Sequence, residues 1–414
     1  MDKRTALPLA GFSVAAVLLT SLSSFMLFAD FFAKTTGVGR DEITYLGTLA
    51  FFSGMPFAKV MGRLLKFYKN SVIGTALVIS LVTTTIFLMP YTNSLLVLLL
   101  FRFVQGSSMI LMEVFSVNYS YIFDERKRVM ATVFSISGVP VGVALGSSLS
   151  FLASMNPYEA YLYMGLLSAL LMVPFLVFLG GRRSDFRPLK LEEPGTTYKK
   201  PVTWVLGFLW MSITGFNLLM ASLYPMFLAQ YDPKAITLAL YVFGFGGFTI
   251  TILGSVIAYY LYPKLGPRSL GLVGTLGFGL SIPGFLLLFV RPTGVLLILA
   301  VLLGRFEAFG ITTIYLSPKL VYPEGMVGKG TWEFSFLGSL GHIIAPMTVI
   351  PIAYQFGFGT AFSLLLIFPV YGMFASLLLP KAFKLAKRRQ SLAAASRDKS
   401  QREPENVKQP EHRQ

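Results

Sequence analysis

Long apolar stretches separated by short polar breaks recur along this chain from residue 7 to residue 380. A hydrocarbon core about 30 Å thick takes roughly 20 residues of helix to cross. Because the stretches are long and do not alternate with period two, they predict membrane-spanning helices and not the strands of a barrel. Cutting at charge clusters and at Pro, Asn and Gly breaks gives twelve spans, at residues 7–31, 43–61, 71–89, 95–121, 129–151, 159–180, 202–228, 236–261, 269–290, 294–317, 331–353 and 360–379.

The composition supports the same fold class. Hydrophobic residues make up 54% of the 414 positions and charged residues only 13%, too little polar surface to coat a water-soluble particle. The first apolar stretch follows Lys3 and Arg4 as a signal peptide would, but it is too long and no small-residue cleavage site closes it. We therefore expect an all-α polytopic membrane protein whose first span is retained.

The basic residues indicate the orientation of the chain. Of its 35 Lys and Arg residues, 29 fall on one side of the predicted membrane, counting Lys59 at the end of its span, and two, Arg102 and Arg305, lie deeper inside spans. The other side carries four, namely Lys34, Arg40, Lys234 and Arg291. Cytoplasmic loops carry the excess of Lys and Arg, so we expect a multi-pass protein of the cell membrane with both termini in the cytoplasm. The net charge of +16 is explained by this asymmetry and does not indicate a nucleic-acid partner.

The sequence contains no cysteine and two histidines, so we expect no metal centre and no cofactor. It has no GxxxxGK[ST] loop that would bind ATP. It also lacks an HExxH pair, a serine nucleophile elbow and clustered carboxylates, so we expect no enzymatic activity.

The longest internal polar break divides the spans six and six. We expect an N-terminal six-helix bundle at 1–180, a cytoplasmic central loop at 181–200, a C-terminal six-helix bundle at 201–380 and a disordered basic cytoplasmic tail at 381–414. Several short patterns recur in the second half at a spacing of about 200 residues, which indicates a duplicated six-span unit. They are Gly54 and Ala58 with Gly254 and Ala258; Phe134, Ser135 and Gly138 with Phe334, Ser335 and Gly338; and Arg102 and Gly106 with Arg305 and Gly310.

These features resemble the major facilitator superfamily over nearly all of residues 1–380. The stretch from Arg102 to Gly106 is similar to the family's RxxQG element, and Gly54, Gly62 and Arg63 fit part of its loop signature. Lys59 stands at or beside the place of the family's aspartate. The resemblance implies two pseudo-symmetric six-helix bundles and gating positions at Gly54, Gly62, Arg63, Gly138, Pro140, Gly142, Gly266 and Arg268. Of these, Gly138, Pro140 and Gly142 look like a blurred form of the kink motif common in proton-driven exporters.

Ionisable groups within the predicted spans are the candidate functional residues. A charge facing hydrocarbon costs about 2.5–3.5 kcal/mol even on insertion scales, so these groups should face a central cavity or one another. The predicted substrate and proton pathway consists of Asp30, Arg102, Gln105, Glu113, Asn217, Arg305, Glu307 and His342. Glu333 also lies within a span, near the inner interface.

Three expectations about these groups concern geometry. Arg102 should hold a carboxylate, and Asp30 is the first candidate because the resemblance implies that spans 1 and 4 are neighbours. Gln105 and Glu113 should share one helix face with Arg102, because their spacing is helical. Arg305 and Glu307, two residues apart, cannot share a face in an ideal helix. The alternative for each charge is a static buried ion pair or a latch between helices.

Together these patterns favour a secondary active transporter that moves a small solute by alternating access, coupled to protons or another ion. Export of a drug or metabolite is slightly favoured, and uptake of a small metabolite such as an anion is the alternative. A non-transporting membrane sensor or assembly partner on the same fold is a hypothesis from another class. The expected partners are the solute, the coupling ion and membrane lipids, and the expected state is a monomer.

Overall fold

The computed structural model describes residues 6–64, 71–148, 156–182, 196–231 and 235–402, and every regular element in these ranges is helical. The first ten helices are α1 (Ala6–Leu27), α2 (Ala29–Thr36), α3 (Arg40–Leu64), α4 (Ser71–Leu88), α5 (Leu95–Ser107), α6 (Leu111–Ile122), α7 (Glu125–Ile136), α8 (Gly138–Ser148), α9 (Pro157–Leu171) and α10 (Val173–Arg182).

The other ten are α11 (Pro201–Tyr231), α12 (Ala235–Tyr241), α13 (Gly247–Leu265), α14 (Arg268–Leu288), α15 (Gly294–Gly304), α16 (Phe309–Val321), α17 (Val327–Ser339), α18 (Gly341–Phe356), α19 (Phe358–Leu365) and α20 (Ile367–Arg402). Short turns of other helix types join some of them. They are the 3₁₀ segments η3 (Met89–Tyr91), η4 (Ser108–Ile110), η8 (Arg305–Ala308) and η9 (Glu324–Met326), and the π segment η7 (Val242–Gly246).

The all-α fold class predicted from the apolar stretches is confirmed. In the described part of the chain, 9 helices are long and apolar enough to cross a membrane, and shorter apolar helices occupy Met130–Gly146 and Pro201–Phe216. The remaining predicted span corresponds to α3, whose first turn is polar because it contains Arg40, Asp41 and Glu42. In its described residues, each of the twelve predicted stretches therefore coincides with a continuous or interrupted helical run.

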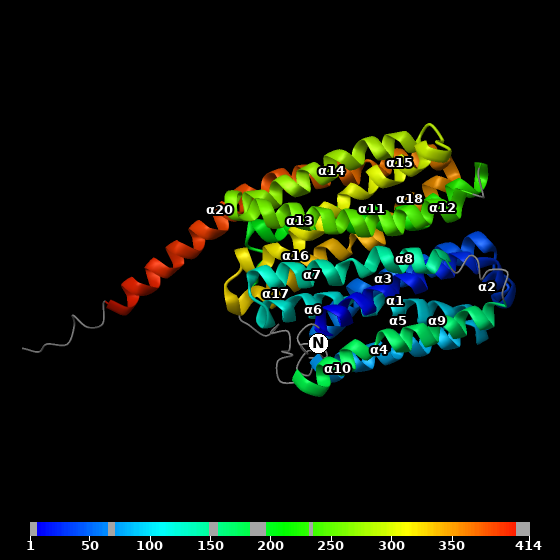
Figure 1. Ribbon diagram of the computed structural model, residues 1–414, viewed down its shortest axis with the longest axis horizontal. Coiled ribbons are helices and arrows are strands. Elements are labelled where there is room, and N and C mark those ends of the chain that lie inside the picture. Colours follow the sequence, from blue (N-terminus) through cyan, green and yellow to red (C-terminus); the bar gives the residue numbers. More distant parts are fainter. Residues whose placement is uncertain (1–5, 65–70, 149–155, 183–195, 232–234, 403–414) are drawn as a thin grey trace, which may run out of the picture.

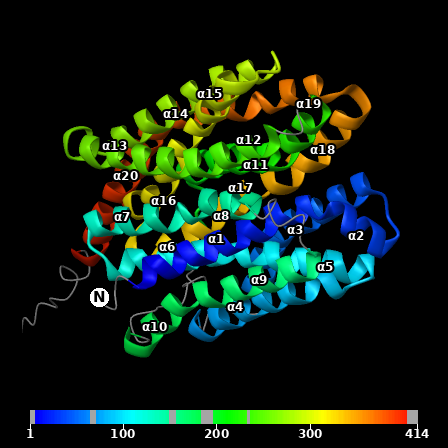
Figure 2. The same cartoon turned by 45° about the vertical axis from the view of Figure 1, so that its right-hand side comes forward.

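The helices gather into two groups, one largely above the other in Figure 1, and α17 of the upper group overlaps the helices of the lower one in Figures 1 and 2. We call α1–α10 the N group and α11–α20 the C group. Within the N group α1 packs on α8 and α3 on α5, and within the C group α11 packs on α17 and α20. The start of α1 and the end of α20 lie at the same end of the molecule (Figure 1). We call this end the N-terminal side.

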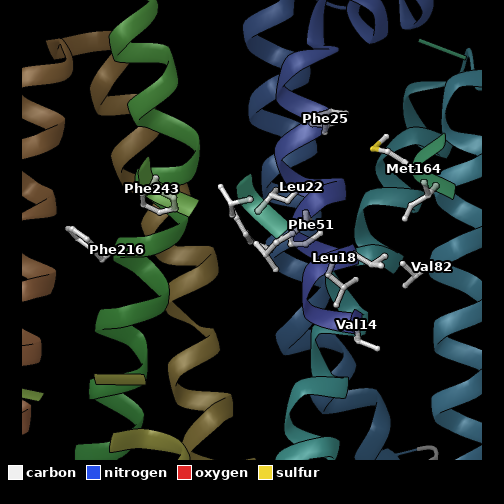
Figure 3. Close-up of a cluster of buried hydrophobic side chains, with 14 of the residues drawn as sticks. Val14, Leu18, Leu22, Phe25, Phe51, Val82, Met164, Phe216 and Phe243 are labelled. Atoms are coloured by element: carbon white, nitrogen blue, oxygen red, sulfur yellow. The ribbon is translucent and has the colours of Figure 1, made fainter. Parts of the chain in front are cut away.

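The two groups meet through apolar side chains. One buried cluster contains residues of both groups, including Leu22 and Phe51 of the N group and Phe216 and Phe243 of the C group. Figure 3 shows Leu22 between α1 and the helices that carry Phe216 and Phe243. The contacting pairs include α8 with η7, α12 and α13, α7 with α13 and α16, α3 with α17 and α18, and α6 with α17.

Glycine permits the closest helix contacts. A Cβ added to Gly106 would collide with the backbone carbonyl of Phe51, and one added to Gly54 would collide with the backbone of Phe103. Gly254, the counterpart of Gly54 at a spacing of 200, packs on Phe309. Small residues let membrane helices approach closely. Span 2 therefore meets span 4 at a glycine, and so does span 8 with span 10.

The expectation of a disordered tail from residue 381 is wrong for the residues described there, because α20 continues as helix to Arg402. Ala382, Phe383 and Ala386 are buried against the C group, so the start of this segment is part of the bundle. The segment is rich in Lys, Arg, Ala, Leu and Gln, which are strong helix formers.

Candidate functional site

Arg102 lies inside the N group and is completely buried. Its Nη1 donates to the carbonyl of Ser21 at 3.2 Å and to Oε1 of Gln105 at 2.9 Å, and its Nε donates to the carbonyl of Gly47 at 3.4 Å. The guanidinium carbon lies 4.4 Å from the ring centroid of Phe25 and 4.8 Å from that of Phe51. Carbonyl dipoles and two aromatic faces therefore stabilise the charge.

Gln105 extends this arrangement into a network that joins three helices. Its Oε1 also accepts a hydrogen bond from Oγ of Ser21 in α1 at 2.9 Å. Its Nε2 donates to Oγ1 of Thr85 in α4 at 3.3 Å. The RxxQG stretch thus holds α1, α4 and α5 together through buried polar groups.

Asp30 is not the partner of Arg102. Its carboxylate lies 3.4 Å from Nε of Arg40, and both side chains are well exposed. The helix is interrupted at Phe28, and Asp30 belongs to the separate short helix α2. A continuous first span, assumed from the sequence, would have placed Asp30 differently.

Arg305 and Glu307 do form an ion pair, contrary to the expectation from helical spacing. Nη1 of Arg305 lies 2.7 Å from Oε1 of Glu307, and both side chains are buried. The two residues lie on the 3₁₀ segment η8, where the ideal α-helical spacing does not apply. The guanidinium also lies 4.3 Å from the ring centroid of Phe243.

The two buried arginines share one packing arrangement. Arg102 contacts Gly47, while a Cβ added to Gly247 would lie 2.5 Å from Nε of Arg305. Gly47 and Gly247 are 200 residues apart, the same spacing as the repeats found in the sequence. Each group therefore keeps its arginine beside a glycine of its own second span.

Glu113 and His342 lie where the two groups meet. Glu113 of α6 is buried and interacts electrostatically with Tyr315 of α16, whose ring packs edge-on against Trp210 at 5.6 Å. The buried ring of His342 in α18 is stacked on Phe52 of α3, with centroids 5.8 Å apart. His342 thus contacts an aromatic ring of the opposite group, and Glu113 lies on α6, which packs on α17 of the opposite group.

The expected stripe from Arg102 through Gln105 to Glu113 is broken. The 3₁₀ segment η4 interrupts span 4 between Gln105 and Glu113. Arg102 and Gln105 consequently form hydrogen bonds inside the N group, while Glu113 lies on α6, the helix that packs on α17 of the C group. The side chain of Asn217, in α11, lies outside the described residues.

The predicted gating residues occupy several environments. Gly138 and Gly142 of α8 pack on the backbone of α1 at Phe12 and Ala16, and Pro140 is buried in the first turn of the same helix. Gly266 ends α13 with a φ of 56°, which favours glycine, and Arg268 is exposed at the start of α14. Gly62 and Arg63 belong to α3, and the surroundings of both, like those of the Lys59 side chain, lie outside what the structure describes.

Glu333 has a role that the sequence did not indicate. Its buried carboxylate accepts hydrogen bonds from the backbone N–H and Oγ1 of Thr197, both at 2.6 Å, and from Oγ1 of Thr196 at 3.1 Å. The hydroxyl of Tyr198 donates to the carbonyl of Glu333 at 3.3 Å. Glu333 therefore attaches the end of the central loop to α17. Thr196 and Thr197, which are adjacent in the sequence before α11, are the feature that could have indicated this role.

Comparisons with known proteins agree with this architecture. A sequence profile of the Major Facilitator Superfamily matches residues 11–346. No curated protein matches the sequence. Among solved structures, the human organic anion transporter MFSD10 (TETRAN) is 16% identical, with a TM-score of 0.65 over 91% of this chain and 100% of that one.

Two further structures share the fold. A bacterial homolog of the human lysosomal transporter Spinster, inward-facing and unoccupied, is 15% identical with a TM-score of 0.61 over 93% of this chain and 98% of that one. The proton:xylose symporter XylE, bound to 6-bromo-6-deoxy-D-glucose, is 13% identical with a TM-score of 0.68 over 91% and 95%. With the profile covering most of the sequence, this chain belongs to the Major Facilitator Superfamily.

Proposed function

We propose that this protein is a secondary active transporter that carries a small solute by alternating access and couples it to protons through Glu113 and His342. The observation that carries the proposal is the burial of both groups where the N and C groups meet. Rocking of one group against the other would expose these side chains first to one side of the membrane and then to the other. A buried ionisable group that is exposed in turn to two compartments can carry a proton between them.

The two arginines fit a different task. Arg305 is neutralised by Glu307 within the C group, and Arg102 is held by carbonyls and rings within the N group. The contacts named above for each arginine lie within its own group. We assign both to the internal stability of each group, which leaves Glu113 and His342 as the coupling residues.

The direction and topology belong to the same proposal. Export is favoured by the resemblance of Gly138, Pro140 and Gly142 to the kink motif of proton-driven exporters. The excess of Lys and Arg favours the cell membrane with both termini in the cytoplasm. The chain would work as a monomer, because both groups that rock are present in one polypeptide.

An anionic solute is the second candidate. Among the residues that the structure describes, Nη2 of Arg102 is buried and makes no hydrogen bond. A buried donor without an acceptor is costly, so an anionic group reaching this atom would be bound well. Direct binding of an organic anion, abolished by Arg102→Lys, would favour uptake or export of such a solute.

The test is reconstitution into liposomes with a pH-sensitive dye inside, an imposed pH gradient and a panel of sugars, organic anions and amphipathic cations. We expect one class of solute to cause proton flux in the wild type. Glu113→Gln should abolish this flux and His342→Gln should reduce it, because each removes a proton site at the interface. Asp30→Asn is the matched control, since Asp30 is exposed and paired with Arg40.

Two outcomes would contradict the proposal. Solute-dependent proton flux that is unchanged in both Glu113→Gln and His342→Gln would show that these groups do not couple transport. Folded protein that moves no member of the panel and conducts no protons would favour the sensor or assembly partner.

A further inference from the structure

A groove of about 660 Å³ lies on the N-terminal side, where α7 of the N group meets α13 of the C group. Met130 and Phe134 line it from α7, and Val256 and Tyr260 line it from α13. All four side chains are exposed although they are large and apolar. In a membrane protein, such exposed positions on spanning helices face lipid, so the groove opens to the bilayer.

The lining changes from charged to apolar with depth. Lys127, exposed in the first turn of α7, lies at the rim, and Phe134 lies seven residues further along the same helix. At a rise of 1.5 Å per residue this separation is about 10 Å. On the other wall, Tyr260 is close to the end of α13 at Leu265 and Val256 is one turn deeper. The groove therefore matches a molecule with a polar head at the membrane surface and an apolar chain below it.

The charge at the rim indicates the sign of that head. Lys127 is paired with Asp124 at 3.6 Å, and both side chains are largely exposed. Among the described residues that line the groove, Lys127 is the one that carries a charge, and Asp124 lies outside the lining. Basic sites between membrane helices at the cytoplasmic surface attract anionic lipid heads. A cationic detergent or drug would instead be repelled by this rim.

We infer that this groove binds one anionic phospholipid of the adjacent leaflet, with its head at Lys127 and an acyl chain along Met130, Phe134 and Val256. Its walls come from both groups, so the bound lipid bridges them. The site is separate from Glu113 and His342, and its occupation can be measured without transport. Failure of the proposed coupling and failure of this inference are therefore distinguishable.

The absence of cysteine from the sequence makes a site-specific test possible. A single cysteine replacing Met130 carries a bimane fluorophore, and the protein is reconstituted in vesicles in which brominated phosphatidylglycerol or brominated phosphatidylcholine quenches the dye. Leu272→Cys is the matched control, because Leu272 is exposed near the start of α14 on the same side of the molecule and does not line the groove.

We expect the anionic lipid to occupy the site at position 130 about fivefold better than the zwitterionic one, as one well-placed cation allows. At position 272 the two lipids should quench equally. Lys127→Gln should remove the preference at position 130, whereas Lys381→Gln, which removes an exposed charge of α20 outside the groove, should preserve it. Equal quenching by both lipids at position 130, or the same preference at both positions, would overturn the inference.

Discussion

The carboxylate of Glu333 is buried away from water, and its oxygens accept several hydrogen bonds. Its hydrogen-bond donors are the backbone N–H and hydroxyl of Thr197 and the hydroxyl of Thr196. Arg305 and Arg102 show two other ways to bury a charge. Arg305 has a carboxylate at 2.7 Å, whereas Arg102 has carbonyls and ring faces. A buried charge is tolerated only when its hydrogen bonds or an opposite charge replace the lost water.

Replacing Glu333 with Gln should loosen the end of the central loop. Gln has nearly the same size, but it is uncharged and its amide group brings donors toward Thr196 and Thr197. Hydrogen bonds to a charged group contribute about 1.5–3 kcal/mol, so we expect the free energy of unfolding to fall by an amount of this order. Thermal unfolding in detergent measures the loss, and trypsin cleavage after Lys199 should become faster.

The control for this change is Glu42→Gln, because Glu42 is exposed in the first turn of α3. It should alter neither the unfolding temperature nor the rate of cleavage after Lys199. If Glu333→Gln behaves like Glu42→Gln, the carboxylate does not hold the loop.

At the scale of whole helices, spans 2 and 4 are joined by a contact with no room for a side chain. Gly106 of α5 faces the backbone carbonyl of Phe51 in α3, and Oγ of Ser107 donates to the carbonyl of Gly54 at 3.0 Å. A backbone carbonyl within a helix cannot move aside as a flexible side chain can. The position of Gly106 thus sets the distance between the two helices.

Gly106→Ala should therefore force α3 and α5 apart. Overpacking of this kind costs typically about 1–3 kcal/mol. The matched control is Gly304→Ala in span 10, where an added Cβ meets nothing within 4 Å. That substitution should instead stabilise by roughly 0.5–1 kcal/mol, because Ala is the better helix former. Unfolding free energies of both variants in one detergent decide the matter, and a Gly106→Ala variant as stable as Gly304→Ala would refute the contact.

The elements that the sequence predicts well are those fixed by local properties. An apolar stretch of 20 residues requires a span wherever it occurs, and the glycines near residues 54 and 254 mark helix contacts in both halves. Ion pairs that depend on an interruption of a helix were not predicted from the sequence. The interruption at Phe28 separates Asp30 from Arg102, and the 3₁₀ turn at Arg305 brings Glu307 within reach. The break at Phe28 has no neighbouring proline or glycine that would have indicated it, whereas Gly304 directly precedes the break at Arg305.

The molecule as a whole is held in its present arrangement by the contacts between the N and C groups. On the side away from the N terminus, α8 packs on the π segment η7, and a Cβ added to Gly244 would collide with Ala144. On the N-terminal side, α7 packs on α13. Alternating access requires one of these contacts to open while the other closes. A change that disfavours only one of them should shift the balance between the arrangements.

Gly244→Val tests this idea directly, because its side chain would wedge α8 and η7 apart. An overpacking penalty of about 1–3 kcal/mol on the closed arrangement corresponds to roughly a 5–150-fold change in the equilibrium between arrangements. A single cysteine at Leu22, which is buried between α1 and the C group, reports the opening through its reaction rate with a membrane-impermeant maleimide (Figure 3). We expect the rate to increase within that range.

Gly246→Val is the control, since a Cβ there meets the side chain of Leu302 in the same group, and the rate should stay at the wild-type value. Equal rates for Gly244→Val and Gly246→Val would mean that the contact between α8 and η7 does not control access to the space between the two groups.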